Sequence, residues 1–252
     1  MTAQVLGLQV AITNLSQAIE TALTRVHKRQ GGYICLANVH MCMEAHDHPA
    51  FAEVLSQSCL RLPDGRPLLW MQKLMGYRDA RQVRGEDFFL GLCEQAQHQQ
   101  INVGVFGGTD AMQLQQLTDD LVQRYPQLRL VYRYAPPFRP LTTEEDAEVE
   151  KQIRTAGVQL LLVAIGCPKQ EQWMASHQHL GPVMVGVGAA VDFVTGNKKR
   201  APLWMQRCGL EWCYRLSQEP RRLLWRYLKH NPRFMLLGLL QLLRYWLAKL
   251  IR

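Results

Sequence analysis

Almost uninterrupted apolar runs recur along this chain and alternate with segments of helical pattern. The clearest runs are 101–106, 158–165 and 183–187, each bounded by glycine, proline or polar residues. A strand that is apolar on both faces belongs inside a sheet that is covered on both sides, as in parallel α/β proteins. The pattern therefore predicts an α/β fold, with a mainly parallel sheet and helices on both of its faces.

The remaining elements continue the alternation. Further apolar runs of strand length cover residues 5–12, 33–39, 59–62 and 128–134. Helical patterns cover residues 15–29, 49–58, 67–75, 87–99, 110–124, 142–156 and 170–177. Ligands of parallel sheets bind beyond the carboxyl ends of the strands. The turns expected at these ends are those at Asn38, Asp64, Gly107, Gly166 and Gly188.

The charge is unevenly distributed. Residues 196–252 contain 13 Lys and Arg against 2 Asp and Glu, whereas residues 1–195 contain 16 against 19. A basic segment on a near-neutral body indicates contact with phosphates of lipid or nucleic acid, and a solvated basic helix is the alternative. Residues 204–229 are rich in Arg and Trp, and Asn231-Pro232 is expected to break the helix there.

Residues 234–251 form a strongly apolar stretch of about the length of a membrane span, but Arg244 and Lys249 interrupt it. At 100° per residue, one broad face carries Leu236, Leu239, Leu243, Trp246, Leu247 and Leu250. The other face carries Arg233, Gln241, Arg244, Lys249 and Arg252. This favours a cationic amphipathic helix lying in a membrane interface, over a helix docked on the core or in an oligomer interface, and over a spanning helix.

Two turns could carry chemistry. Asp64 lies in Pro63-Asp64-Gly65, where an aspartate is usually only a turn residue, but at a strand end it could act as a general base toward a sugar hydroxyl. Residues 166–171 lead from a strand into a helix, and the free N–H groups of a helix start suit a phosphate. Lys169 would add charge and Gln170 could read a polar ring edge, unless the turn merely caps itself. Cys167 lacks a histidine placed to activate it.

Other cofactor patterns are weak. Residues 186–192 lack the third glycine and the acidic residue of a dinucleotide-binding fingerprint, and residues 104–108 miss that pattern too. We find no metal-binding motif and expect neither a metal nor another cofactor. A departing nucleotide diphosphate would then be stabilised by arginines, for which the candidates are Arg215, Arg221, Arg222 and Arg226.

Taken together, these segments resemble the WecG/TagA/CpsF glycosyltransferases of bacterial surface-polysaccharide and teichoic-acid synthesis. The resemblance covers residues 5–227. It is carried, in order, by Ala37-Asn38, Pro63-Asp64-Gly65, Arg84-Gly85-Glu86-Asp87, Phe106-Gly107-Gly108, residues 166–171, Gly186-Val187-Gly188 with Asp192, Arg200-Ala201-Pro202, and residues 209–222.

The resemblance implies a Rossmann-like core and a metal-independent, inverting transferase. The enzyme would move a hexose, of N-acetylmannosamine or glucose type, from a UDP-sugar to a sugar on undecaprenyl diphosphate. It would be peripheral at the cytoplasmic face of the inner membrane. Residues 1–195 would form the catalytic core and residues 196–252 the membrane-associating appendage. The donor hexose, the acceptor sugar and the oligomeric state stay open.

The resemblance also assigns site residues. Asp64 would be the catalytic base, and the acceptor would contact Asn38, Arg84 and Asp87. The nucleotide-sugar would contact Gly107, Gly108, Gly166, Lys169, Gln170, Asp192, Arg215 and Arg222. Two positions depart from the family pattern. Leu36 replaces a threonine, so that a hydroxyl contact is lost, and Cys167 replaces a smaller residue.

Two other function classes fit parts of the sequence. A basic nucleic-acid-binding module could use the tail, but the strand turns lack aromatic stacking platforms and the body gives no continuous basic groove, so we expect no nucleic-acid partner. A non-catalytic scaffold for membrane enzymes is the other alternative, and the intact turns at Asp64 and at residues 166–171 argue against it.

Overall fold

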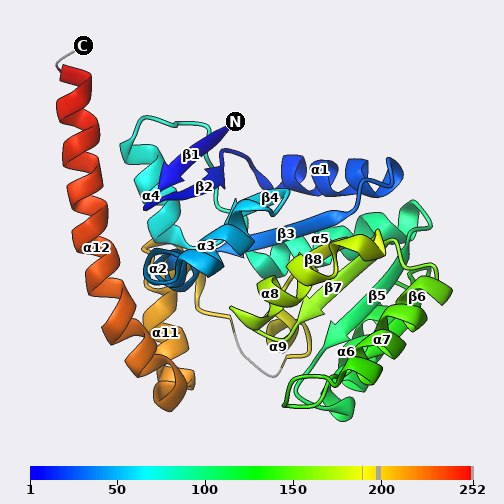
Figure 1. Ribbon diagram of the computed structural model, residues 1–252. Coiled ribbons are helices and arrows are strands. Elements are labelled where there is room, and N and C mark those ends of the chain that lie inside the picture. Colours follow the sequence, from blue (N-terminus) through cyan, green and yellow to red (C-terminus); the bar gives the residue numbers. More distant parts are fainter. Residues whose placement is uncertain (189, 197–199, 251–252) are drawn as a thin grey trace.

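A six-stranded parallel sheet forms the centre of the molecule, in the strand order β4-β3-β8-β7-β5-β6. The computed structural model describes residues 1–188, 190–196 and 200–250. The strands are β3 (Gly32–Ala37), β4 (Leu60–Pro63), β5 (Asn102–Gly107), β6 (Arg129–Tyr134), β7 (Leu160–Ala164) and β8 (Val183–Gly186). The predicted α/β class with a parallel sheet is confirmed (Figure 1).

Helices cover both faces of this sheet, as predicted. One face packs against α1 (Leu15–His27), α5 (Gly85–His98), α6 (Ala111–Arg124) and α9 (Ala190–Val194). The other packs against α2 (Val39–Asp47), α3 (Pro49–Ser56), α4 (Arg66–Leu74), α7 (Thr143–Thr155) and α8 (Lys169–Ser176), with the 3₁₀ turn η1 (Gln178–Leu180) leading to β8.

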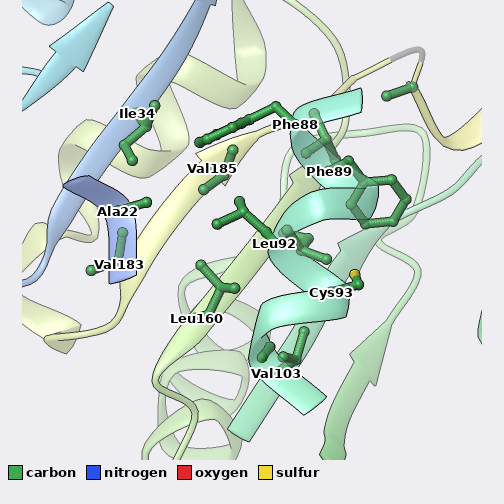
Figure 2. Packing of buried hydrophobic residues seen from close by; sticks show 14 of the residues in the cluster. Ala22, Ile34, Phe88, Phe89, Leu92, Cys93, Val103, Leu160, Val183 and Val185 are labelled. Carbon is green, nitrogen blue, oxygen red and sulfur yellow. The ribbon is translucent and has the colours of Figure 1, made fainter. Parts of the chain in front are cut away.

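Neighbouring strand residues enter opposite cores because side chains alternate across a sheet. In β3, Ile34 packs with the first group of helices, whereas Tyr33 and Cys35 pack with the second. Figure 2 shows the first core, where Phe88 and Leu92 of α5 lie over the sheet. Burial on both faces explains why the strands read as continuous apolar runs.

The N-terminal segment differs from the sequence prediction. A single strand over residues 5–12 is wrong, because β1 (Thr2–Val5) and β2 (Leu8–Ala11) form a separate antiparallel hairpin. The two residues between them, Leu6 and Gly7, both have positive φ, at 46° and 89°. Such a two-residue turn matches the twist of the paired strands, and glycine tolerates it without strain.

The C-terminal segment forms α10 (Leu203–Arg207), α11 (Glu211–Gln218) and α12 (Pro220–Leu250). The expected break at Asn231-Pro232 is wrong, because α12 continues through Pro232 (Figure 1). A proline removes one helical hydrogen bond but does not forbid the helix where packing holds it. Here His230, Phe234 and Gly238 are buried on either side of Pro232.

The second half of α12 docks on the domain through polar contacts. Gln241 Nε2 donates to the carbonyl of Gln4 at 2.6 Å, and its Oε1 accepts from the backbone N–H of Leu6 at 2.8 Å. The Tyr245 hydroxyl donates to the carbonyl of Met75 at 2.8 Å. The face of α12 that contains Gln241 therefore meets the β1–β2 hairpin and the end of α4.

The apolar face of α12 points away from the domain. The exposed side chains that were predicted to share this face are Leu236, Leu239, Leu243, Trp246, Leu247 and Leu250. Residue Arg252, predicted for the opposite face, and residue 251 lie outside the described residues. In the described part of the chain, every helix falls short of the length or apolar character needed to cross a membrane. We call the six exposed side chains the leucine face.

Candidate active site

A cleft of about 840 Å³ opens at the carboxyl edge of the sheet. One wall is built by the ends of β3, β4, β5, β7 and β8, and the other by α11 and the first half of α12. The predicted site residues that line it are Asn38, Asp64, Arg84, Gly108, Gly166, Gln170, Asp192, Arg215 and Arg222. Segments from residue 36 to residue 235 thus converge on one cavity.

Asp64 directly follows β4 and is fixed through its backbone and its side chain. Its N–H donates to the carbonyl of Ala37 in β3 at 2.9 Å, and its carbonyl accepts from Gln82 Nε2 at 2.6 Å. The carboxylate Oδ1 accepts from the backbone N–H of Gly85 at 2.9 Å. Among the described residues, no hydrogen bond engages Oδ2, so this oxygen is available to a ligand in the cleft.

Gly85 lies close to the side chain of Leu36. A Cβ at Gly85 would lie 2.9 Å from Leu36 Cδ1, so that the leucine side chain would have to shift to accommodate a larger residue. Gly85 is also the first residue of α5, so its N–H is one of the donors that a helix start leaves without an intrahelical partner. The start of α5 therefore holds the carboxylate at the end of β4.

The electrostatic environment tunes Asp64 to a pKa of about 6, above its ordinary value. Burial is the main cause, since it disfavours the charged form, and the nearby Glu211 acts in the same direction. Arg215, the Gly85 N–H and Arg84 oppose the rise. A carboxylate with a pKa near the working pH suits general base catalysis, because it is ionised yet still basic.

Arg215 brings a charge from α11 toward this carboxylate. Burial acts to lower its pKa, but Glu211 and Asp64 outweigh it, and the pKa of the guanidinium is raised. One terminal nitrogen contacts Glu211 at 2.8 Å, and the guanidinium lies 4.9 Å from the centre of the Phe193 ring. Its buried Nε has no hydrogen-bond partner among the described residues. This donor is therefore not satisfied by the described part of the protein.

Further arginines line the same cleft, at Arg66, Arg84, Arg222 and Arg226. Burial, followed by the charge of Arg84, lowers the pKa of Arg66, so these two cations are held close together. Arg66 Nε is likewise buried without a partner in the described structure. Arg222 contacts Glu219 at 2.7 Å and is half exposed. Clustered cations with unused donors form a site suited to a diphosphate.

Asn38 lies beside the Asp64 turn and caps α2. Its Oδ1 accepts from the N–H of Met41 at 3.1 Å, which satisfies one of the donors at the helix start. Its amide nitrogen makes no hydrogen bond to the described residues and can donate to a ligand. Leu36 and Cys167, the two residues that depart from the family pattern, also line the cleft.

Gln170 is buried, and both polar atoms of its side chain are hydrogen-bonded within the protein. Its Oε1 accepts from the N–H of Gly166 at 3.2 Å, and its Nε2 donates to Glu171 at 2.7 Å. A Cβ at Gly186 would lie 2.8 Å from its Nε2. Gln170 thus fixes the turn after β7 against the end of β8, and it contributes to the cleft wall mainly as a positioning residue.

Asp192 opens into the cleft from the short helix α9. Its Oδ1 accepts from Gln113 Nε2 of α6 at 2.9 Å. This contact ties the carboxylate of Asp192, at the cleft wall, to α6, which follows β5.

Three predicted site residues lie outside the cleft lining. Lys169 is exposed at the start of α8. Asp87 contacts Arg200 at 3.0 Å. Gly107, with φ 146°, faces β7, where a Cβ would lie 2.6 Å from the backbone of Ala164. The geometry gives Gly107 a packing role, whereas Gly108 beside it reaches the cavity.

A comparison with known proteins identifies the family of the chain. The profile of the glycosyl transferase WecG/TagA/CpsF family matches residues 3–248. The chain belongs to this family. The family match spans the sheet, the cleft and nearly all of α12, and it confirms the resemblance seen in the sequence.

Members of the WecG/TagA/CpsF family are found among curated proteins at moderate identity. A protein of Bacillus spizizenii is 29% identical over 225 residues, covering 88% of this chain and 84% of its own length. One of Bacillus subtilis is 29% identical over 84% of this chain and 80% of its own. One of Staphylococcus aureus is 26% identical over 92% and 89%. All three are named N-acetylglucosaminyldiphosphoundecaprenol N-acetyl-beta-D-mannosaminyltransferase.

Sequence reasoning missed several cleft residues of this family member. Arg66 follows the Pro-Asp-Gly turn directly, and its position beside Asp64 could have drawn attention to it. Glu211 was noted only as part of a motif, although it contacts Arg215 and acts on Asp64. His40 and His230, which also line the cleft, lie 190 positions apart in the sequence, and no local signal connects them.

Proposed function

We propose that this glycosyltransferase moves N-acetylmannosamine from a UDP-sugar to N-acetylglucosamine carried on undecaprenyl diphosphate, with inversion at the anomeric carbon. The printed activity of the relatives supports the two sugars and the lipid carrier. The observation that carries the proposal is the position of Asp64. Its carboxylate is fixed by the Gly85 N–H, has a pKa of about 6, and lies in a cleft lined with arginines.

The proposed reaction is a single displacement. The acceptor hydroxyl oxygen attacks the anomeric carbon of the donor while Asp64 takes the hydroxyl proton. The bond between that carbon and the UDP oxygen breaks, and the electron pair leaves with UDP. Attack from the face opposite the leaving group inverts the configuration. Asn38 and Arg84, on the side of Asp64, would hold the acceptor.

The leaving group needs positive charge where its own charge develops. The arginines of α11 and α12, with Arg66, offer this charge, and Arg66 and Arg215 each have a buried Nε without a partner among the described residues. Donors that are in place before the reaction stabilise the departing oxyanion without a cost of reorganisation. We assign UDP to this wall of the cleft and its sugar to the side of Gly108, Gly166 and Asp192. In this scheme the chemistry proceeds without a metal ion.

The lipid acceptor places the enzyme at a membrane. The leucine face of α12 is exposed, and the same helix carries Arg221 and Lys229, which are exposed outside the cleft lining, toward its start. Apolar side chains can enter the interface while basic residues meet anionic headgroups. We propose peripheral binding at the cytoplasmic face, with residues 1–195 as the catalytic core and residues 196–252 as the appendage that docks on the bilayer.

Release of UDP by the purified full-length protein tests the function. The reaction would contain a synthetic polyprenyl-diphosphate N-acetylglucosamine acceptor and one UDP-sugar from a panel, with and without EDTA. Release that requires the acceptor, prefers UDP-N-acetylmannosamine and persists in EDTA is expected. Equal release with UDP-glucose would contradict the donor assignment, and dependence on added Mg²⁺ or Mn²⁺, the ions that bind diphosphates, would contradict the arginine mechanism.

A further inference from the structure

Helices α2 and α12 meet beside the cleft through a cluster of two histidines and a glutamate. His40 and Glu44 lie four residues apart on one side of α2, and His230 faces them from α12. His40 Nδ1 is 3.8 Å from Glu44 Oε1, and His230 Nε2 is 3.5 Å from the same oxygen. The two imidazole rings are 5.1 Å apart between centroids and are tilted by 58°.

These spacings are too long for hydrogen bonds, which join nitrogen and oxygen at about 2.7–3.2 Å. His40 Nδ1 is buried and has no hydrogen-bond partner among the described residues, and the same holds for His230 Nδ1. A buried polar atom without a partner costs about 1–3 kcal/mol. Of the two ring nitrogens that face Glu44 Oε1, His40 Nδ1 is thus an unsatisfied buried atom, and His230 Nε2 approaches the same oxygen at a distance longer than a hydrogen bond.

The spacings fit three ligands around a metal ion. Bonds of about 2.0–2.1 Å in a tetrahedral zinc site separate neighbouring ligand atoms by about 3.3 Å. The three atoms here already lie within 4.8 Å of one another. We propose that His40, Glu44 and His230 form a site for a divalent transition-metal ion such as Zn²⁺, which joins α2 to α12.

A second cluster in the molecule shows what a satisfied arrangement looks like. Asp146, Glu150 and His177 are grouped at a similar spacing. There, however, His177 Nε2 contacts Asp146 at 3.1 Å and His177 Nδ1 lies 2.7 Å from the carbonyl of Trp173. Both ring nitrogens of His177 already have hydrogen-bond partners, so this histidine has no free nitrogen for a metal ion. The contrast singles out the cluster at α2 and α12.

Both negative and positive side chains lie around the proposed metal site. Glu44 supplies a negative charge, and Arg233 nearby is neutralised by Asp47 through two contacts of 2.6 and 2.8 Å. Arg226 and Lys229 of α12 remain as positive neighbours of His40. Imidazole ligands suit zinc, whereas Mg²⁺ and Ca²⁺ prefer oxygen ligands.

The consequence is a metal clamp between core and appendage. Asn38 begins the turn that leads into α2, and α12 carries Arg222 and Arg226 into the cleft. A metal bound at this junction would hold the two cleft walls at a fixed separation. It would bind only the docked arrangement, so it would stabilise that arrangement by mass action. The clamp adds to the arginine mechanism and does not enter the chemistry.

Metal binding to the full-length protein, without substrate, tests the site. After removal of metals with a chelator, Zn²⁺ is titrated against a chromophoric competitor, and Co²⁺ is followed by absorption. We expect one equivalent in the wild type, and a loss of affinity of more than about tenfold in His230→Gln and in His40→Gln. His46→Gln, an exposed histidine on the same helix, is the matched control and should bind as the wild type does.

The outcomes separate this site from other ligands of the chain. Unchanged Zn²⁺ affinity in both histidine variants would overturn the proposal, as would no binding by the wild type. A thiolate charge-transfer band in the Co²⁺ spectrum would assign the metal to the free cysteines and would overturn it as well. Zn²⁺ should also raise the Tm of the wild type but not that of Glu44→Gln. Because no substrate is present, failure here leaves the UDP-release result untouched.

Discussion

Asp64 and Arg215 stabilise each other's charge across the cleft. Burial raises the pKa of Asp64 to about 6, and Arg215 is the strongest influence in the opposite direction. The Asp64 carboxylate in turn helps to raise the pKa of Arg215. One residue ends a strand of the core and the other belongs to α11, so the basicity of the proposed catalytic base depends on where the C-terminal segment lies.

Replacing Asp64 should remove the proton acceptor and leave the fold intact. Asp64→Asn is expected to lower kcat by a factor of about 10²–10⁴, the usual contribution of a general base. UDP release under saturating donor and acceptor measures this. Asp119→Asn, an exposed aspartate on α6, is the control. Turnover of Asp64→Asn near that of the wild type would rule out Asp64 as the base.

The pH dependence should report the same carboxylate. Asp64 must be ionised to accept a proton, so kcat/KM should fall as the pH drops below about 6, the pKa of the folded protein. Arg215 favours the ionised form, and its removal in Arg215→Gln should raise the Asp64 pKa and move this limb to higher pH. Profiles of kcat/KM for the two proteins test the sign. If the acidic limb of the profile stays in place or moves to lower pH, Arg215 does not lower the pKa of Asp64.

Variants of Arg222 and Lys169 distinguish two possible positions of the donor diphosphate. Arg222 lines the cleft, whereas Lys169 is exposed outside it. Arg222→Ala should raise KM for the UDP-sugar by about tenfold, because a charge-assisted hydrogen bond is worth about 1.5–3 kcal/mol, part of which the partner arginines retain. Lys169→Ala should change KM by less than about twofold. The reverse order would place the diphosphate at the start of α8.

The close packing of β5 against β7 at Gly107 predicts how an alanine there would change the free energy of unfolding. Gly107 and Gly181 both have positive φ, but only at Gly107 does a Cβ meet backbone, 2.6 Å from Ala164, whereas nothing lies within 4 Å at Gly181. Alanine should cost about 1–2 kcal/mol at either position for the backbone conformation, with about 1–3 kcal/mol more at Gly107 for the clash. Denaturant unfolding of the two variants measures the difference. If both variants lose the same free energy of unfolding, the close approach of Ala164 does not explain the glycine at position 107.

The leucine face predicts membrane binding. Leu239 and Leu243 are 55% and 52% exposed, so burying the exposed halves of the two side chains contributes about as much as burying one whole leucine, about 1.5–3 kcal/mol. A double replacement by serine should weaken binding to anionic vesicles by about 10–100-fold, and added salt should weaken binding of the intact protein. Val122→Ser on α6 is the control for loss of an exposed apolar residue. Vesicle sedimentation that is unchanged in the double variant would place the membrane contact elsewhere.

Where the sequence predicted the fold well, burial was the reason. The runs around β5, β7 and β8 are apolar on both faces because helices cover both faces, and that signal is local. The hairpin of β1 and β2 was missed because its turn depends on positive φ at Leu6, a non-glycine residue. The course of α12 through Pro232 depends on packing of Phe234 against distant residues, which no local pattern reveals.

The candidate site likewise contains features that the sequence predicted and features that it did not. Asp64 could be proposed from its turn, and the family resemblance supplied roles for several other residues. The contact of Arg215 with Glu211 and the meeting of His40 with His230 arise from tertiary packing across long sequence separations. The exclusion of Lys169 and Asp87 from the cleft also follows from the direction of their side chains, which the spacing of motifs does not encode.

The continuity of α12 gives the molecule a mechanical element. At about 1.5 Å per residue, its 31 residues form a rod of about 46 Å, with cleft arginines near one end and the leucine face toward the other. The far half of this rod is tied to the N-terminal hairpin and to the end of α4 by Gln241 and Tyr245. A single helix thus connects the first residues of the chain to the arginines that line the cleft.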